Sequence, residues 1–203
     1  MEETRRERKK RQTRQLLVAT AFRLFLEQGY EQTTIAQITA AADVAKKTFF
    51  NHFPTKEDVL FADAEQYYQA TNEVIAERAP DERIPDLLLR IYDRVITRRL
   101  ADSPLPENAE AINELSKLVM TVPAVQAKAL HVMFDLQQTI AEALLKAYPD
   151  LLDPTTAAAA VGSVMGAAQA AGIASLREGH SAEEYLASTR RAIDIAIQGL
   201  RSL

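Results

Sequence analysis

The chain has no cysteine, and its 203 residues include only six glycines, eight prolines and three histidines. The absence of cysteine excludes disulfide bonds and thiolate metal sites, and it fits the cytoplasmic location that we expect. Scarce glycine and proline favour helices over a loop-rich β-fold. Residues 155–176 come nearest to an apolar run of about 18 residues that spans a membrane, but they are mostly alanine and glycine. We therefore expect no membrane association.

Motifs that carry catalysis are missing as well. The chain has no nucleotide-binding loop, no metal-ligand spacing and no nucleophile signature, and its histidines are scattered, at His52, His131 and His180. Such a sequence gives little support to a helical enzyme. We expect no enzymatic activity, no catalytic residue, no cofactor and no metal site.

Positive charge is concentrated at one end of the chain. The net charge is −4, yet residues 1–60 carry eleven Lys and Arg against eight Asp and Glu, whereas residues 61–203 carry thirteen against twenty. The basic segment 5–14 has three possible roles: a solvated helix start, a membrane-binding helix, or an arm that contacts DNA. The membrane role conflicts with the core positions that the same helix supplies. We favour the DNA arm, which adds salt-sensitive affinity for phosphate.

Residues 33–53 contain the pattern of two short helices joined by a tight turn. Thr34 and Gln37 form a capping box at the start of the first helix. Residues 42–44 make the turn, and the second helix covers 45–51. A short polar helix after a tight turn suits the major groove of DNA. The pattern therefore predicts a helix-turn-helix that reads a DNA sequence.

The remaining segments also have the pattern of helices, separated by proline, glycine and capping residues. We expect a first helix over 5–28, ended by Gly29, and a fourth helix over 55–78. Later helices are expected at 86–100, 107–121, 123–148, 154–178 and 181–200. The predicted fold class is all-α, with about nine helices. An N-terminal three-helix bundle with the helix-turn-helix occupies 1–56, and a larger helical domain for ligand binding and dimerisation occupies 57–203.

Several motifs between Arg14 and Asp58 follow a recognisable order and spacing. They are Arg14-x-x-Leu17, Ala21-x-x-Leu24-Phe25, Gly29-Tyr30-x-x-Thr33-Thr34, Ile38, Ala42-x-Val44, Thr48-Phe49-Phe50-x-His52-Phe53 and Lys56-Glu57-Asp58. Together they resemble the N-terminal signature of the TetR family of transcriptional regulators. The rest of the chain resembles that family only in being helical and of suitable length.

The resemblance implies a homodimer whose two N-terminal domains read the halves of a palindrome in double-stranded DNA. It also implies a C-terminal domain that binds a small-molecule effector and then loosens the grip on DNA. We therefore expect a ligand-responsive transcriptional regulator that acts as a repressor.

The candidate DNA-binding residues surround the second helix of the motif. Asn51 suits an adenine edge, and Lys46 or Lys47 suits a guanine or a phosphate. Lys56 matches the lysine that contacts phosphate in the family, and His52 is a further donor on the phosphate side. The full set is Thr33, Thr34, Lys46, Lys47, Thr48, Phe50, Asn51, His52 and Lys56.

Three residues of the motif depart from the family pattern. Asp43 stands where glycine is usual in the turn, and aspartate is one of the few residues that tolerate a positive φ. Ala45 stands where a serine usually caps the recognition helix, so the cap is weakened unless Asp43 replaces it. Phe50 replaces a tyrosine and so removes a hydroxyl that family members point at phosphate.

The last two helices have the pattern of a dimer interface. Residues 157–174 are rich in alanine and glycine, and the final helix has an apolar stripe, so a pair from each chain can form a four-helix interface. An ordinary intrachain core is the alternative. The expected effector residues are Tyr67, Tyr68, Met120, His131, Phe134, Gln137, Gln138, Met165 and Gln169. Few charged residues lie among them, which favours an apolar or aromatic effector.

A different class of function stays open beside the regulator. The altered residues Asp43, Ala45 and Phe50 are compatible with a protein-interaction module that has kept the helix-turn-helix fold and lost specific DNA binding. Affinity for a palindromic fragment, compared with random DNA, separates the two hypotheses.

Overall fold

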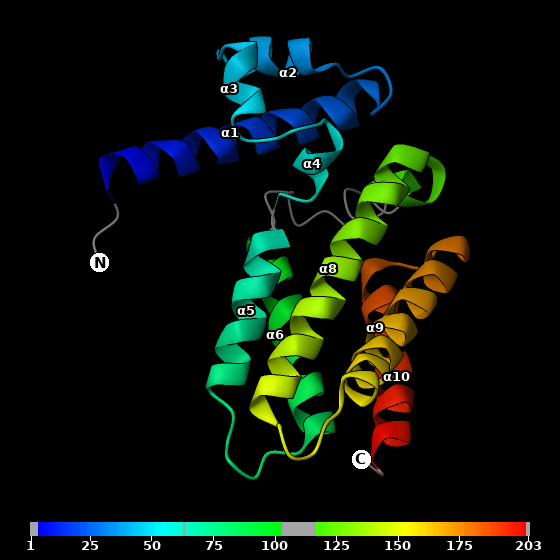
Figure 1. Cartoon of the computed structure of the whole chain (residues 1–203). Helices are drawn as coiled ribbons and strands as arrows, with labels where there is room; N and C mark the ends of the chain where they lie inside the picture. Colours follow the sequence, from blue (N-terminus) through cyan, green and yellow to red (C-terminus); the bar gives the residue numbers. More distant parts are fainter. Residues whose placement is uncertain (1–3, 63, 103–116, 202–203) are drawn as a thin grey trace. The chain divides into compact units, whose positions relative to one another are not determined.

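The computed structural model describes residues 4–62, 64–102 and 117–201, and all regular structure within these ranges is helical (Figure 1). The all-α prediction is therefore confirmed. The helices are α1 (Arg5–Gln28), α2 (Ile35–Ala41), α3 (Lys46–Phe50), α4 (Glu57–Leu60), α5 (Ala64–Ala76), α6 (Ile84–Asp102), α8 (Pro123–Ala147), α9 (Pro154–Arg177) and α10 (Ala182–Leu200).

The capping residues expected from the sequence begin these helices. Thr34 and Gln37 form the capping box of α2, and Ser181 and Glu184 form that of α10. Asp153 caps α9, where its carboxylate accepts from the backbone amides that follow Pro154. Each cap satisfies backbone N–H groups that have no partner inside the helix, and this fixes where the helix starts.

The prediction of one fourth helix over 55–78 is wrong, because the structure has two helices, α4 and α5, in this range. The backbone leaves helical geometry at Phe61, which ends α4 with φ −114° and ψ 27°, and α5 begins at Ala64. The carbonyl of Ala62 accepts a hydrogen bond of 2.9 Å from the Arg14 guanidinium. A cation from α1 therefore satisfies a carbonyl at the break. The expected helix over 107–121 lies partly outside the described residues, and 117–121 are helical.

The chain divides into two compact units. The described parts of the first unit are residues 4–62 and 117–129, and those of the second are 64–102 and 130–201. The boundary at 56/57 expected from the sequence lies within the first unit, which continues through α4. The first unit also includes a segment remote in sequence, 117–129, which contains the first residues of α8.

The first unit has an aromatic core. Phe49 and Phe53, at and after the end of α3, are fully buried against α1 residues such as Leu17. Val125 of α8 is fully buried in the same core, although more than sixty positions separate it from the other members. Burying a large apolar side chain contributes about 1.5–3 kcal/mol, so the three helices of the motif have enough core to hold one geometry.

The second unit has its own aliphatic core. In Figure 1, α5 lies along α6, and α9 lies along α10, as their residue contacts also show. Leu87 of α6, Leu144 of α8, Val161 of α9 and Ile193 of α10 are buried together with Val74 of α5. All five described helices of the unit therefore share one core.

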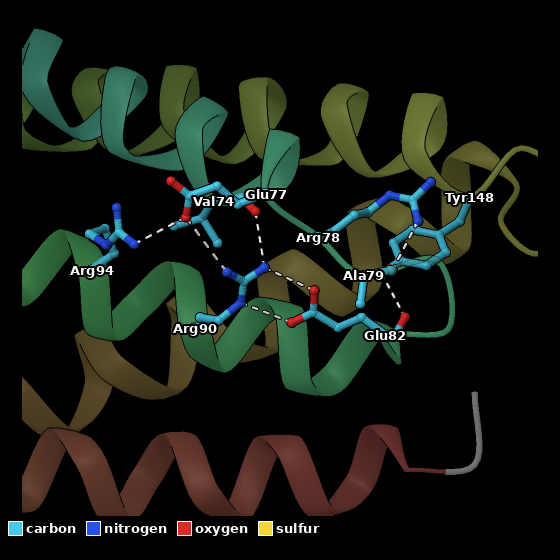
Figure 2. A network of polar contacts seen from close by, with 8 residues as sticks. All are labelled: Val74, Glu77, Arg78, Ala79, Glu82, Arg90, Arg94 and Tyr148. Atoms are coloured by element: carbon cyan, nitrogen blue, oxygen red, sulfur yellow. Dashed lines mark hydrogen bonds and ion pairs between the residues drawn. The ribbon is translucent and has the colours of Figure 1, made fainter.

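Figure 2 shows a polar network that fixes the connection between α5 and α6. The Arg90 guanidinium donates to both carboxylate oxygens of Glu82 at 2.9 Å and to the carbonyl of Val74 at 3.1 Å. The Tyr148 hydroxyl, at the end of α8, donates to the carbonyl of Glu82, and Arg78 stacks on the Tyr148 ring. Bidentate pairs of this kind specify geometry. Within the second unit, the network thus holds the α5–α6 connection against the end of α8.

Helix α9 is the one described helix that is long and apolar enough to cross a membrane by length and composition, with a mean hydropathy of 1.4 over 18 residues. This is weak evidence, because helices of soluble proteins meet the same criterion. The apolar character comes mainly from alanine, and α9 contributes Ala157, Ala160 and Val161 to the core of the second unit.

Candidate nucleic-acid interface

Helix α3 has one buried and one exposed side. Phe49 is fully buried, whereas Lys46, Lys47 and Asn51 are exposed and Thr48 is half-buried. The Phe50 ring is 47% exposed and lies 6.0 Å from the Lys46 ammonium. The buried phenylalanine fixes the rotation of the helix, so the polar residues predicted to read DNA lie together on its solvent side.

The turn before α3 has the geometry that its unusual aspartate suggested. Asp43 has a φ of 52°, and among the described residues it is the one non-glycine with positive φ. Its neighbour Val44 donates a backbone hydrogen bond of 3.0 Å to Thr39, which closes the turn. Asp43 provides no cap for α3, because Ala45 occupies the N-cap position without any side-chain hydrogen bond. The first turn of α3 is therefore uncapped by side chains.

Substitution of Asp43 tests this left-handed turn. We expect Asp43→Val to lower the free energy of unfolding of the first unit by about 1–2 kcal/mol, because a β-branched residue strongly disfavours positive φ. Asp43→Gly should not lower it, since glycine adopts this conformation freely. Urea unfolding, monitored by amide exchange in α2 and α3, measures the free energy of unfolding of both variants. Equal losses in the two variants would contradict the argument.

The adjacent threonines at the start of α2 have different environments. Thr34 is exposed and caps the helix through its hydroxyl. Thr33 is only 1% exposed, and its hydroxyl donates to the carbonyl of Gly29 at 2.8 Å and accepts from Gln28 at 3.1 Å. Thr34 remains a candidate for phosphate contact. The Thr33 side chain instead holds the α1–α2 turn from inside.

Lys56 lies against the α1–α2 turn. Its ammonium donates to the carbonyls of Tyr30 at 2.8 Å and Thr33 at 3.0 Å, and it lies 3.9 Å from the centroid of the Tyr30 ring. The next residue, Glu57, accepts a hydrogen bond of 2.6 Å from the Tyr30 hydroxyl. Burial lowers the pKa of Lys56, against the opposing effect of Glu31 and Glu57. The half-exposed lysine expected at phosphate thus also holds the α1–α2 turn.

His52 is half-buried behind α3. Its Nδ1 is buried without a hydrogen-bond partner among the described residues. Burial lowers the pKa of its imidazole, as do the positive charges of Arg14 and Lys10. The Arg14 guanidinium donates to the His52 carbonyl at 3.0 Å and stacks 4.3 Å from the Phe53 ring centroid. Arg14 therefore ties α1 to the end of α3, a role that the sequence did not suggest.

The basic segment 5–14 forms the first turns of α1. Thr4 caps the helix in a capping box with Glu7, and residues 5–12 are exposed. The segment is therefore a helical extension of α1. Its proposed contact with DNA stays a prediction.

Comparison with known proteins agrees with this geometry. Residues 17–62 match the family model described as bacterial regulatory proteins, tetR family. Residues 17–62 therefore belong to the tetR family. The match begins at Leu17 and so contains the core of α1, the two helices of the motif and α4.

Curated relatives match part of this chain. The HTH-type transcriptional regulator TcmR of Streptomyces glaucescens is 33% identical over 126 residues, which are 62% of this chain and 55% of TcmR. The HTH-type transcriptional repressor DhaR of a Mycobacterium species is 35% identical over 72 residues, 36% of each chain. The chain thus spans about half, or less, of the length of the relatives that it matches.

Solved structures share the fold over nearly the whole chain. A tetR-family regulator from Mesorhizobium loti has a TM-score of 0.59 at 18% identity, with 97% of this chain and 96% of that chain covered. The fatty acid degradation regulator FadR of Bacillus halodurans has a TM-score of 0.58 at 16% identity, with 99% of both chains covered. These likenesses show the fold of the chain beyond the matched N-terminal segment.

An ion pair joins α4 to α8 within the first unit. Asp58 lies 2.6 Å from the Lys128 ammonium and also accepts from the backbone and hydroxyl of Thr55. Burial alone would raise the pKa of Asp58, but the hydrogen bonds from Lys128 and Thr55 outweigh it and lower the pKa. Nothing in the sequence indicates this pair, because seventy positions separate its members.

The Asp58–Lys128 pair predicts a pH dependence of stability. An unfolded aspartate titrates near 3.9, and its pKa is lower in the folded state. Its contribution is therefore complete above about pH 4 and is lost as the pH falls through the folded pKa. We expect Asp58→Asn to cost about 1–3 kcal/mol at pH 7 and to reduce the acid-dependent loss of stability.

Urea unfolding of the first unit at pH 7, 5 and 3 measures this dependence. Asp150→Asn, at an exposed turn of the second unit, is the control and should leave the profile unchanged. A profile for Asp58→Asn parallel to that of the wild type would contradict the assignment.

The residues expected to bind an effector fall into three groups. Half-buried positions of the second unit hold Tyr67, Tyr68, Gln137 and Met165. Exposed positions hold His131, Phe134, Gln138 and Gln169. Met120 lies in the first unit. The structure therefore does not gather the nine residues in one interior, and the assignment stays a prediction for the half-buried group.

One interior polar residue of the second unit was missed from the sequence. Thr71 of α5 is fully buried, and its hydroxyl has no hydrogen-bond partner within the described part of the chain. Other helical threonines, such as Thr139 and Thr189, donate to the carbonyl four residues earlier. A buried hydroxyl without a partner is costly. The sequence pattern does not indicate this unpaired hydroxyl, because the orientation of the Thr71 side chain decides whether it finds a partner.

Proposed function

We propose that this protein is a DNA-binding transcriptional regulator that acts as a repressor on a palindromic operator. The observation that carries the proposal is the exposed polar side of α3, with Lys46, Lys47 and Asn51 held in place by the buried Phe49. Side chains on such a helix read base edges in the major groove, while exposed lysines contact phosphate.

The regulator acts as a homodimer in this proposal. Two recognition helices must lie about 34–36 Å apart to enter successive major grooves. Surface residues of α9 and α10 support an interface between two copies: Ile195 is 66% exposed, and the exposed side of α9 carries Ala159, Ala170 and Ala174. Small side chains allow helices to approach closely, and a two-fold pair of helices forms a four-helix interface.

A small-molecule effector would bind in the second unit and lower the affinity for DNA. Thr71 and the half-buried Tyr67, Tyr68 and Gln137 are the candidate contacts, and an apolar or aromatic molecule with one hydrogen-bonding group fits them. A structure of the same fold is a complex of SmeT with triclosan, at 17% identity and a TM-score of 0.59. The effector shifts the equilibrium by its differential affinity for the two states.

The proposed location is the cytoplasm, where the DNA lies. Binding DNA and an effector requires no catalysis, so the protein is proposed to be no enzyme.

The decisive experiment compares two DNA fragments over a range of salt concentrations. One fragment carries a palindrome, to be sought in the DNA upstream of the gene, and the other has a random sequence of equal length. We expect the palindrome to bind about 10³-fold or more tightly, with two chains per site. Equal and weak binding to both fragments would favour the protein-interaction module.

A further inference from the structure

Helix α3 is too short to hold its own geometry. It has five residues, and no side chain caps its first turn. A helix of this length is not stable by itself, because few hydrogen bonds offset the cost of fixing its backbone. The direction in which Lys46, Lys47 and Asn51 face the solvent therefore depends on the contacts that anchor the ends of α3.

The Arg14 guanidinium is a polar anchor at the C-terminal end of α3. One of its terminal nitrogens donates to the carbonyl of His52 at 3.0 Å, and its carbon lies 4.3 Å from the centroid of the Phe53 ring. Phe53 is 1% exposed, so the surface on which Arg14 stacks belongs to the core. Unlike the exposed residues 5–12 of the same helix, Arg14 is half-buried. Its side chain thus joins α1 to the chain just beyond α3.

The other terminal nitrogen of Arg14 reaches the break between α4 and α5, where it donates to the carbonyl of Ala62 at 2.9 Å. The carbonyls of His52 and Ala62 both lie beyond the last residue of a helix, in a region where intrahelical donors are lacking. A guanidinium holds its donors in a fixed planar fork. One side chain of α1 therefore fixes the end of α3 relative to the break that follows α4.

We infer that Arg14 is a positioning residue for operator recognition: it fixes the direction of the recognition helix α3 and ties that helix to the α4–α5 break. The inference rests on the proposed DNA-binding function. Contacts with base edges require a defined helix direction, whereas contacts with phosphate are less demanding and carry no sequence information. Loss of the tie should therefore weaken binding to the operator more than binding to random DNA.

The variant Arg14→Lys tests this role at constant charge. A group that acts through its charge tolerates lysine, but an ammonium does not replace a planar fork that joins two carbonyls and stacks on a ring. We expect Arg14→Lys to lower the ratio of the affinities for the palindrome and for random DNA about tenfold or more, which is the size of one lost base contact. The affinities are measured at a temperature where circular dichroism shows every variant fully folded.

The matched control is Arg23→Lys on the same helix. The Arg23 guanidinium is exposed and pairs with Glu27 one turn later, without a carbonyl partner among its recorded contacts in the described chain. We expect this variant to keep the wild-type affinity ratio. A wild-type ratio for Arg14→Lys as well would overturn the inference, because the charge of Arg14, or its effect on stability alone, would then account for its role.

The imidazole of His52 reports the position of the guanidinium in the absence of DNA. Burial lowers the pKa of His52, and the positive charges of Arg14 and Lys10 lower it further. Proton NMR should therefore give His52 a higher pKa in Arg14→Met than in the wild type. An unchanged His52 titration would contradict the place of Arg14 at the end of α3. If Arg14→Met does not fold, Arg14→Lys decides the question through the affinity ratio.

Amide exchange at the end of α3 completes the test. The Phe53 amide donates to the carbonyl of Phe49 at 2.8 Å, and we expect it to exchange faster in both Arg14 variants. Wild-type exchange in both variants would overturn the inference. If the wild-type protein binds the palindrome and random DNA alike, the proposed function fails instead. The exchange rates and the His52 titration then still decide whether Arg14 holds the end of α3.

Discussion

Phe53→Ala should lower the free energy of unfolding of the first unit by about 3–5 kcal/mol, which is a large part of the 5–15 kcal/mol that stabilises a typical domain. The Phe53 ring is fully buried, lies 5.6 Å from the Phe49 ring and supports the Arg14 guanidinium at 4.3 Å. Its removal leaves a cavity and also takes away the surface on which Arg14 stacks. The end of α3 would then lose its anchor to α1.

The measurement must distinguish the two units. Amide exchange in α1–α3 should report the loss, while exchange in α9 and α10 should keep its wild-type protection, because these helices belong to the other unit. Phe50→Ala is the matched control, since Phe50 neighbours the core in sequence but is 47% exposed. We expect it to cost less than about 1 kcal/mol. Equal losses for the two phenylalanines would show that the buried ring does not organise the motif.

Asn51→Ala should reduce the preference for the operator over a single-base variant by about 5–150-fold, corresponding to the 1–3 kcal/mol of a bidentate base contact. Asn51 is the C-cap residue of α3, and its side chain is exposed rather than buried in the core. Affinity for random DNA should hardly change, because an amide neutralises no phosphate.

The control for this result is Asn72→Ala, which changes an exposed asparagine on α5 in the second unit. Competition binding with operators altered at each position of one half-site locates the base that Asn51 reads. If Asn51→Ala weakens every altered operator equally, Asn51 contributes to the backbone contacts or to the structure and does not read a base.

Local signals in the sequence predicted most of the helical architecture. The capping boxes at Thr34 and Ser181, the glycine that ends α1 and the aspartate before α9 each act within four residues of a helix end. All residues of such a signal lie within a short stretch of chain, so the sequence pattern alone predicts the helix end. The polar side of α3 was predicted for the same reason.

The contacts that could not be predicted are those between residues remote in sequence. The two carbonyl partners of Lys56 lie more than twenty positions earlier, so its contact with the α1–α2 turn has no local signal. Thr33 and Thr34 are identical in type, and only the packing of the α1–α2 turn places one inside and the other outside. The break between α4 and α5 has no local signal, and Arg14 of α1 satisfies a carbonyl there. In each case, tertiary packing overrides a local pattern.

Val125 has a consequence for any attempt to separate the parts of this chain. A fragment that stops at Ala62 would keep the whole motif and yet lack this fully buried side chain and the Lys128 partner of Asp58. Its core would therefore be exposed to water at the place that Val125 fills. Chimaeras that exchange DNA-binding modules between regulators would need to carry residues 117–129 together with the N-terminal sequence, because the two segments form one compact unit.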